Sequence, residues 1–221
     1  KLGWRQQSGN QTWQIAANSV TDKGFKNDAG FDQQKLSLKH SWTGSELSTN
    51  THLALVNLNQ ETAGYIKVKD SYKDSAAWKA NPNPEAFRDG QAMRLSSRIS
   101  GATRAGNEWQ ITPYVRKSEM TFLQHYLPGQ PEEKNGQTSA GVQSSYQTSF
   151  ATDTTLWLGT DVEWASMWVE EFQANALGVA NNVRYQGQHY DFEVDSQQIA
   201  LFANLEWQVS DQLTTELGLR Y

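Results

Sequence analysis

The stretch Ile199–Gln208, IALFANLEWQ, decides the fold class. Its odd-numbered positions hold Ile, Leu, Ala, Leu and Trp, whereas its even-numbered positions include Asn, Glu and Gln. A period of two is the period of a β-strand, because successive side chains point to opposite faces of a sheet. The same period resumes in Leu213–Tyr221 after a short polar turn. The two stretches therefore predict a β-hairpin with one apolar and one polar face.

The same alternation recurs along the whole chain. In residues 109–116, WQITPYVR, the apolar phase again opposes Gln, Thr and Arg. The pattern predicts an all-β fold of about ten antiparallel strands of roughly nine to fourteen residues each, longer than the strands of most soluble sheets. Residues 53–58 are less regular because both phases are apolar. Pro113 removes one ladder hydrogen bond, which predicts either a bulge or the level at which the strand leaves the membrane.

Short and long connections alternate between these strands. The short ones have the Gly, Asn, Asp and Ser composition of tight hairpin turns and lie at residues 8–10, 43–46, 105–107, 152–153 and 210–211. The long polar ones lie near residues 20–30, 60–90, 119–136 and 172–195. Bacterial outer-membrane barrels have short periplasmic turns and long extracellular loops. The spacing therefore predicts an antiparallel up-and-down transmembrane β-barrel segment.

The composition supports a barrel that is apolar outside and wet inside. Charged residues make up 19%, below the roughly 25% of soluble domains, yet the chain has 9 Trp, 8 Tyr and 8 Phe. Disorder would explain the neutral polar residues but not the aromatic ones. No apolar run approaches the roughly 18 residues of a membrane-spanning helix. The N-terminus does not resemble a signal peptide, so we expect the sequence to be mature or partial.

Several classes of function are disfavoured. The chain has no Cys and a net charge of -5, which exclude thiolate chemistry and argue against nucleic-acid binding. No metal-binding spacing connects the four histidines, and no nucleophile motif is present, so we expect no catalytic residues, metal or cofactor. The side chains of the adjacent pairs Glu132-Glu133 and Glu170-Glu171 are expected to point to opposite faces if they lie on a strand, and to be solvated if they lie in a loop. The chain is therefore not expected to be an enzyme.

Four tryptophans lie close to short turns and share the apolar phase: Trp13, Trp42, Trp109 and Trp207. Indole rings concentrate at membrane interfaces, where the ring lies in lipid and its N–H remains hydrated. We therefore expect these four to form an aromatic ring at the periplasmic interface, with Trp164, Trp168 and Phe172 marking the opposite rim. The alternative is that Trp ends strands in any β-protein.

Longer stretches resemble one family of barrels. They are Gln198–Trp207 with Leu217–Tyr221, Leu156–Trp164, Leu123–Pro131 and Asn81–Asp89. These stretches are similar to the mid-barrel strands and extracellular loops of TonB-dependent outer-membrane receptors. The resemblance implies active uptake of a scarce nutrient, most often a ferric siderophore or similar iron complex, in the outer membrane of a Gram-negative bacterium. Its implied partners are outer-membrane lipid, that ligand, and TonB acting through a plug domain.

The family plan implies a barrel of about 22 strands around an N-terminal plug. Residues 1–221 show about ten strands, no plug and no energy-coupling box. We therefore expect a partial receptor-like barrel domain, because open strand edges are not tolerated in lipid.

The long loops carry the candidate ligand-binding residues. Aromatic and cationic side chains suit an anionic ligand, since aromatic rings stack and Lys or Arg pairs with negative charge. The candidates are Tyr65, Tyr72, Trp78, Arg88, His125, Tyr126, Arg184 and Tyr185. Asn81-Pro82-Asn83 partly matches a haem-receptor motif, but its second half is absent, so siderophore ranks above haem. Two alternatives remain open: a passive porin-like or other outer-membrane barrel, and a soluble carbohydrate-binding β-sandwich.

Overall fold

A computed structural model describes residues 1–67, 69–176 and 184–221 and contains ten strands. The strands are β1 Leu2–Ser8, β2 Gln11–Asp22, β3 Phe31–Thr43, β4 Leu47–Glu61, β5 Phe87–Ala102, β6 Glu108–Leu123, β7 Glu132–Ala151, β8 Thr154–Gln173, β9 Gly187–Ser210 and β10 Leu213–Arg220. The loop between β4 and β5 holds a 3-10 turn, Ser71–Lys73, and one short helix, α1, Ser75–Lys79.

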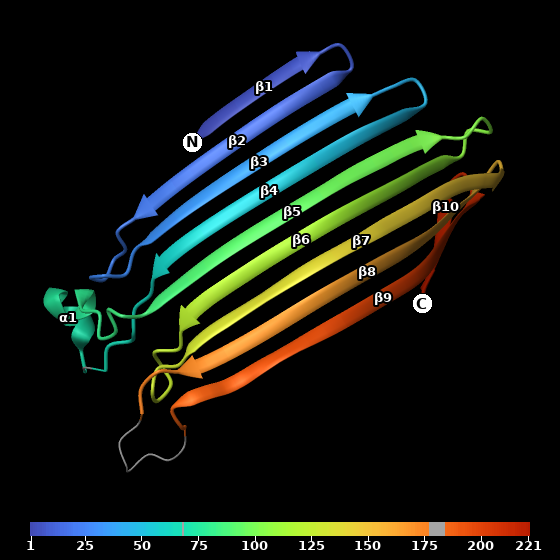
Figure 1. Cartoon of the computed structure of the whole chain (residues 1–221). Coiled ribbons are helices and arrows are strands. Elements are labelled where there is room, and N and C mark those ends of the chain that lie inside the picture. Colours follow the sequence, from blue (N-terminus) through green and yellow to red (C-terminus); the bar gives the residue numbers. More distant parts are fainter. Residues whose placement is uncertain (68, 177–183) are drawn as a thin grey trace.

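All ten strands form one antiparallel sheet in chain order, from β1 to β10. Short turns join the strands at one end, and the longer loops and α1 lie at the other (Figure 1). Gly9 and Gly106 have φ of 56° and 84° in two of the short turns, a conformation that glycine adopts without steric cost. Among the described residues β1 pairs only with β2 and β10 only with β9, so the sheet is not closed.

The register divides the sheet into two faces, because residues directly opposite each other on paired strands point the same way. Leu38, Leu53 and Leu95 are opposite one another on β3, β4 and β5, and Val115 on β6 continues the row. We call this side the apolar face. The next residues along these strands, Lys39, His52, Ser96 and Tyr114, form a row on the other side, which we call the polar face.

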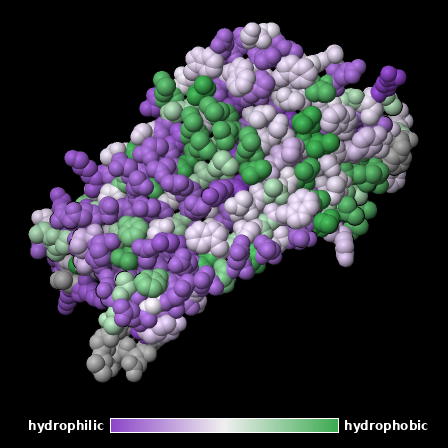
Figure 2. Space-filling view, viewed as in Figure 1, coloured by the Kyte–Doolittle hydropathy of each residue, from purple (hydrophilic) through white to green (hydrophobic). Residues whose placement is uncertain are grey.

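The apolar side chains are not buried within the chain. Among the described residues the only buried hydrophobic side chain is Ala86, whereas Ile199, Leu217 and Leu219 are more than two thirds exposed. Hydrophobic atoms gather over the strands, and the end that carries the long loops is mainly hydrophilic (Figure 2). A soluble sheet would cover this face with a second layer. The exposed apolar face is instead typical of strands that lie against lipid.

The predicted all-β fold of about ten strands is confirmed, but the strands from β4 to β9 are longer than the predicted lengths. β7 and β8 have 20 residues each and β9 has 24. The segment predicted as a loop at 119–136 is paired strand except for 124–131, and residues 187–195 belong to β9. The other two long loops are 23–30 and 62–86. Near the loops the side chains on both faces of these strands are polar. The alternation of apolar and polar residues therefore ends before the hydrogen bonding between the strands does.

Pro113 interrupts one ladder without shifting it. The β5–β6 pairing passes from Ser96–Tyr114 to Ile99–Ile111 with the register unchanged, and Pro113 lies in the gap. On its other side Pro113 stays opposite Val142 of β7. The missing N–H therefore removes pairing locally, and the predicted bulge is not formed.

Candidate ligand-binding site

The polar face carries ion pairs and hydrogen bonds that connect β6, β7, β8 and β10. The Tyr114 hydroxyl and the Arg116 guanidinium both donate to the Glu163 carboxylate. Arg116 Nε also donates to Ser139 Oγ at 3.0 Å. The Arg220 guanidinium donates to Asp161 Oδ2 at 2.7 Å. A barrel interior that holds water accepts such groups, whereas lipid does not.

A second cluster lies on the polar face at the loop end of β8. The Glu171 side chain is 3% exposed and pairs with the Arg184 guanidinium. His189 Nδ1 lies 2.7 Å from the same carboxylate oxygen, and His189 Nε2 lies 2.7 Å from the Tyr185 carbonyl oxygen. The register shifts at this point, since Glu171 is opposite Tyr190 whereas the next β8 residue is opposite Gln188. This bulge directs the His189 ring toward Glu171.

The long loops contact one another above the sheet. Lys26 Nζ donates to the Gly64 carbonyl at 2.6 Å, and Asn81 Nδ2 donates to the Asp28 carbonyl at 2.9 Å. These bonds connect the 23–30 and 62–86 loops. Phe25 and Trp78 add an aromatic contact between the same two loops, with ring centroids 6.4 Å apart.

Glu85 connects the 62–86 loop to the 124–131 loop. Gln130 Nε2 donates to Glu85 Oε1 at 2.6 Å, and Asn83 Nδ2 donates to the same oxygen at 3.1 Å. The Glu85 backbone N–H, and next the Asn83 amide, lower the pKa of the Glu85 carboxyl group below its ordinary value. Hydrogen bonds to the ionised form favour that form. The contact between the two loops is therefore strongest when Glu85 is charged.

The structure places the predicted ligand-binding residues in two settings. The tyrosine side chains extend into solvent: Tyr65 is 70% exposed, Tyr72 66%, Tyr126 63% and Tyr185 65%. Lys67 Nζ lies 5.1 Å from the centre of the Tyr65 ring, and Lys73 Nζ lies 5.4 Å from that of Tyr72. These rings and cations are available to a ligand that approaches from the loop end.

The other predicted residues already make contacts within the chain. Trp78 lies against Phe25, and Arg184 pairs with Glu171. Arg88 lies on the polar face at the loop end of β5, with its guanidinium carbon 5.8 Å from the centre of the Phe122 ring. His125 makes an edge contact with Tyr126, with ring centroids 5.6 Å apart. The eight residues therefore surround the loop end of the sheet without forming one cluster.

Sequence reasoning missed the part played by Glu171 and His189. Glu170 and Glu171 lie on β8 and point to opposite faces, as expected for a strand, and the Glu171 side chain is 3% exposed. Its partners Arg184 and His189 follow it by 13 and 18 residues in the sequence, and no local spacing signals that contact. Within the described residues no group of three or more His, Asp and Glu side chains could hold a metal ion.

The four tryptophans predicted to form a ring all lie on the apolar face near the short turns. Trp13 and Trp207 are 47% and 48% exposed, and Trp42 and Trp109 are intermediate. The Trp13 ring stacks on His40, with centroids 4.1 Å apart. Of the residues predicted for the opposite rim, Trp164 is 53% exposed on the same face of β8.

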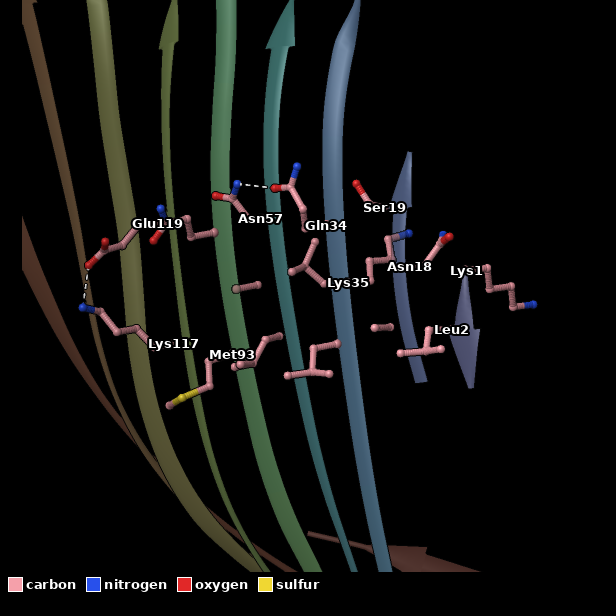
Figure 3. A pocket seen from close by; sticks show the side chains of 16 residues that line it. Lys1, Leu2, Asn18, Ser19, Gln34, Lys35, Asn57, Met93, Lys117 and Glu119 are labelled. Carbon is pink, nitrogen blue, oxygen red and sulfur yellow. Dashed lines mark hydrogen bonds and ion pairs between the residues drawn. The ribbon is translucent and has the colours of Figure 1, made fainter. Parts of the chain in front are cut away.

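A groove of about 850 Å³ crosses the apolar face over β1–β6. Two rows of side chains line the groove (Figure 3). One is mainly apolar and includes Met93, and the other is polar and lies nearer the loops. In the polar row Asn57 Nδ2 donates to Gln34 Oε1 at 2.7 Å, and Glu119 Oε1 lies 2.7 Å from Nζ of Lys117, which is opposite Met93 in the other row. The groove marks the level at which the apolar face becomes polar.

Comparisons with known proteins agree on one type of barrel. A family model described as "TonB dependent receptor-like, beta-barrel" matches residues 2–221. No curated protein matches the sequence.

Solved structures share the fold at low sequence identity. The unliganded ferric citrate transporter FecA superposes with a TM-score of 0.76 at 10% identity, over 98% of this chain and 33% of that one. The ferripyoverdine receptor of Pseudomonas aeruginosa gives 0.77 at 8% identity, over 97% and 33%. BauA, the ferric preacinetobactin receptor from Acinetobacter baumannii, gives 0.67 at 8% identity, over 96% and 36%. The chain therefore spans about a third of the length of these structures.

Proposed function

Because the chain belongs to the TonB-dependent receptor-like β-barrel family, we propose that it forms part of the wall of an active-transport receptor for a scarce nutrient. The barrels of this family lie in the outer membrane of Gram-negative bacteria, and the family consists of transport receptors rather than enzymes. The proposed nutrient is a ferric siderophore or a similar iron complex. The proposed energy source is the TonB system, acting through a plug domain that the barrel encloses.

The observation that carries this proposal is the continuity between the polar face and the loop end. Arg88 and Phe122 lie on the polar face directly below loops whose exposed tyrosines have cations beside them. Aromatic rings and cations hold an anionic chelate by stacking and by charge. A ligand caught at the loops would enter the lumen along this face.

The structural neighbours support iron as the cargo, since they include a ferric citrate transporter, a ferripyoverdine receptor and a ferric preacinetobactin receptor. The β-sandwich alternative has no structural support, because all strands of the described residues belong to one sheet. A passive porin has no support from the family match.

We also propose that Trp13, Trp42, Trp109 and Trp207 lie at the periplasmic membrane interface. Their common face and their closeness to the short turns support that placement. Ring contact with lipid carbonyls and hydration of the indole N–H would fix the height of the barrel in the bilayer.

The experiment is iron uptake in a host that lacks its own siderophore receptors. The full receptor chain is expressed, and uptake of radioactive iron is measured from a panel of ferric siderophores. We expect at least one chelate to be taken up, and uptake to cease in a strain without TonB. Uptake that continues without TonB would contradict energised transport, and no uptake of any chelate would contradict the iron proposal.

The role of the rim is tested by Tyr72→Ala combined with Arg88→Ala in the same receptor. Loss of one ring and one guanidinium is expected to weaken ligand binding by about tenfold, since each contact contributes roughly 0.5–1 kcal/mol. Unchanged uptake and binding would exclude this part of the rim from the ligand site. A matched variant, Lys134→Ala on the apolar face, should bind normally.

A further inference from the structure

The polar face of β3, β4 and β5 carries a set of basic side chains at successive levels. They are Lys35 and Lys39 on β3, His52 on β4, and Arg94 and Arg98 on β5. Lys39 and His52 are directly opposite each other. We call this set the cationic strip.

The register gives the level of each member along the sheet. Lys35 is level with Ala92 through Val56, and the Lys39–His52 pair is level with Ser96. The members of the strip therefore lie at the levels of β5 residues 92, 94, 96 and 98. Arg88 lies on the same face, nearer the loop end. Two residues of strand rise about 7 Å. From Arg88 to Arg98 the basic groups descend about 33 Å, roughly the thickness of the hydrocarbon core.

No acidic side chain of β3–β5 shares this face. The acidic residues of these strands are Asp32, Glu61 and Asp89, and all three lie in rows of the apolar face near the loops. Among the described residues the lysines and arginines of the strip make no ion pair. Only His52 has a side-chain bond, in which its Nε2 lies 2.9 Å from Ser37 Oγ.

The polar face of β8 to β10 has the opposite charge. It carries Asp161, Glu163, Glu206 and Glu216, and the cations beside them are paired: Arg220 with Asp161, and Arg116 of β6 with Glu163. Within the part of the chain that the structure describes, the face is therefore divided into a basic part without ion pairs and an acidic part. The neighbours of the strip on β4 and β5, such as Ala54 and Ser96, are small and uncharged, and on β6 Arg94 is opposite a further cation, Arg116, which pairs with Glu163.

We propose that the cationic strip binds an anionic iron chelate with free carboxylates and guides it along the lumen from the loop end toward the turn end. This inference rests on the proposed function, since it needs a ligand that enters the barrel. Unpaired cations along a confined wall raise the local concentration of anions. Rings or rows of Lys and Arg select anions in membrane pores, and several weak sites in series allow a ligand to move on. Guanidinium groups also hold carboxylates by two parallel hydrogen bonds.

The test uses the full receptor chain purified in detergent, with pyrene trisulfonate as the anionic probe. Its fluorescence anisotropy reports binding to the unsubstituted receptor, to Lys39→Gln with Arg94→Gln, and to a control pair, Lys117→Gln with Lys134→Gln. The control removes the same charge from the apolar face. We expect the strip variant to bind the dye about tenfold more weakly, as two lost ion contacts predict, and the control to bind normally. Binding should also weaken as salt is raised.

Equal binding by the strip variant and the unsubstituted receptor would overturn the proposal. So would an absence of dye binding together with a lowered unfolding midpoint in the strip variant, which would indicate that an acidic protein surface covers the strip. The iron-uptake experiment is separate. Uptake that is insensitive to these charges refutes the strip alone, whereas charge-dependent dye binding without uptake of any chelate refutes the proposed function alone.

Discussion

Replacing Arg184 with leucine tests whether the ion pair with the buried Glu171 carboxylate holds residues 184–190 against the end of β8. The Glu171 side chain is 3% exposed, and its partners Arg184 and His189 are 21% and 8% exposed. Removing one partner of a buried ion pair costs about 3–5 kcal/mol, because the remaining charge is left unpaired. His189 stays beside the carboxylate and Arg184 is partly hydrated, so we expect the lower end, about 3 kcal/mol. This corresponds to a rise of roughly a hundredfold in local opening.

Hydrogen exchange of the receptor in detergent, read by mass spectrometry, measures this opening directly. Peptides that cover residues 184–190 should exchange about a hundred times faster in Arg184→Leu, while peptides from the middle of β6 should not change. Lys134→Leu is the matched control, because Lys134 and Glu132 form an ion pair in which both side chains are more than a third exposed. Surface pairs contribute only about 0–1 kcal/mol. Equal exchange in both variants would refute the reasoning that burial gives the Glu171 cluster its strength.

Three further predictions follow from the faces and the loops. Leu95→Arg should destabilise the folded barrel in lipid vesicles by about 2–4 kcal/mol, whereas Ser96→Arg should cost at most about 1 kcal/mol, because the new charge meets the cations of the strip but stays on the polar face; equilibrium unfolding measures both. The lowered pKa of Glu85 means that its loop contact is fully present above the ordinary carboxyl pKa and is lost as pH falls through the lowered value. Protease cleavage in 124–131 should therefore increase as pH falls below about 4.3, and Glu85→Gln should remove that dependence. Gly129→Ala should cost about 2 kcal/mol and expose the same loop to protease, because φ is 81° and a Cβ would overlap Gln173; an unchanged cleavage rate would contradict this.

The sequence allowed the architecture to be predicted because lipid permits few exceptions. A membrane-spanning strand must place an apolar side chain at every second position, so the alternation is visible without an alignment. The short turns were equally readable, since Gly9 and Gly106 mark positions of positive φ. Residues 53–58 are apolar at both odd and even positions, yet they form one continuous strand. Ala54, Val56 and Leu58 lie on the polar face, and the pairing with β3 and β5 is uninterrupted there.

The loop end was less predictable for physical reasons. Above the membrane both faces of β7 and β9 meet water, so nothing in the pattern of hydrophobicity separates a long strand from a loop. Contacts such as Gln130 with Glu85 join residues 45 apart, and they depend on the shape of two loops rather than on local spacing. The cationic strip needed the register as well, because Lys39 and Arg94 are neighbours only once β4 is placed between them.

The most direct test of the account is the accessibility of single cysteines along β5. The chain has no natural Cys, so each residue from 93 to 98 can be replaced in turn and labelled with a nitroxide in the receptor in lipid vesicles. Relaxation by oxygen, which concentrates in lipid, and by a water-soluble nickel complex should alternate with a period of two. Positions 93 and 95 should favour oxygen, and positions 94, 96 and 98 should favour nickel. Equal accessibility of both sets, or a period other than two, would contradict a sheet with one face in lipid and one in a wet lumen.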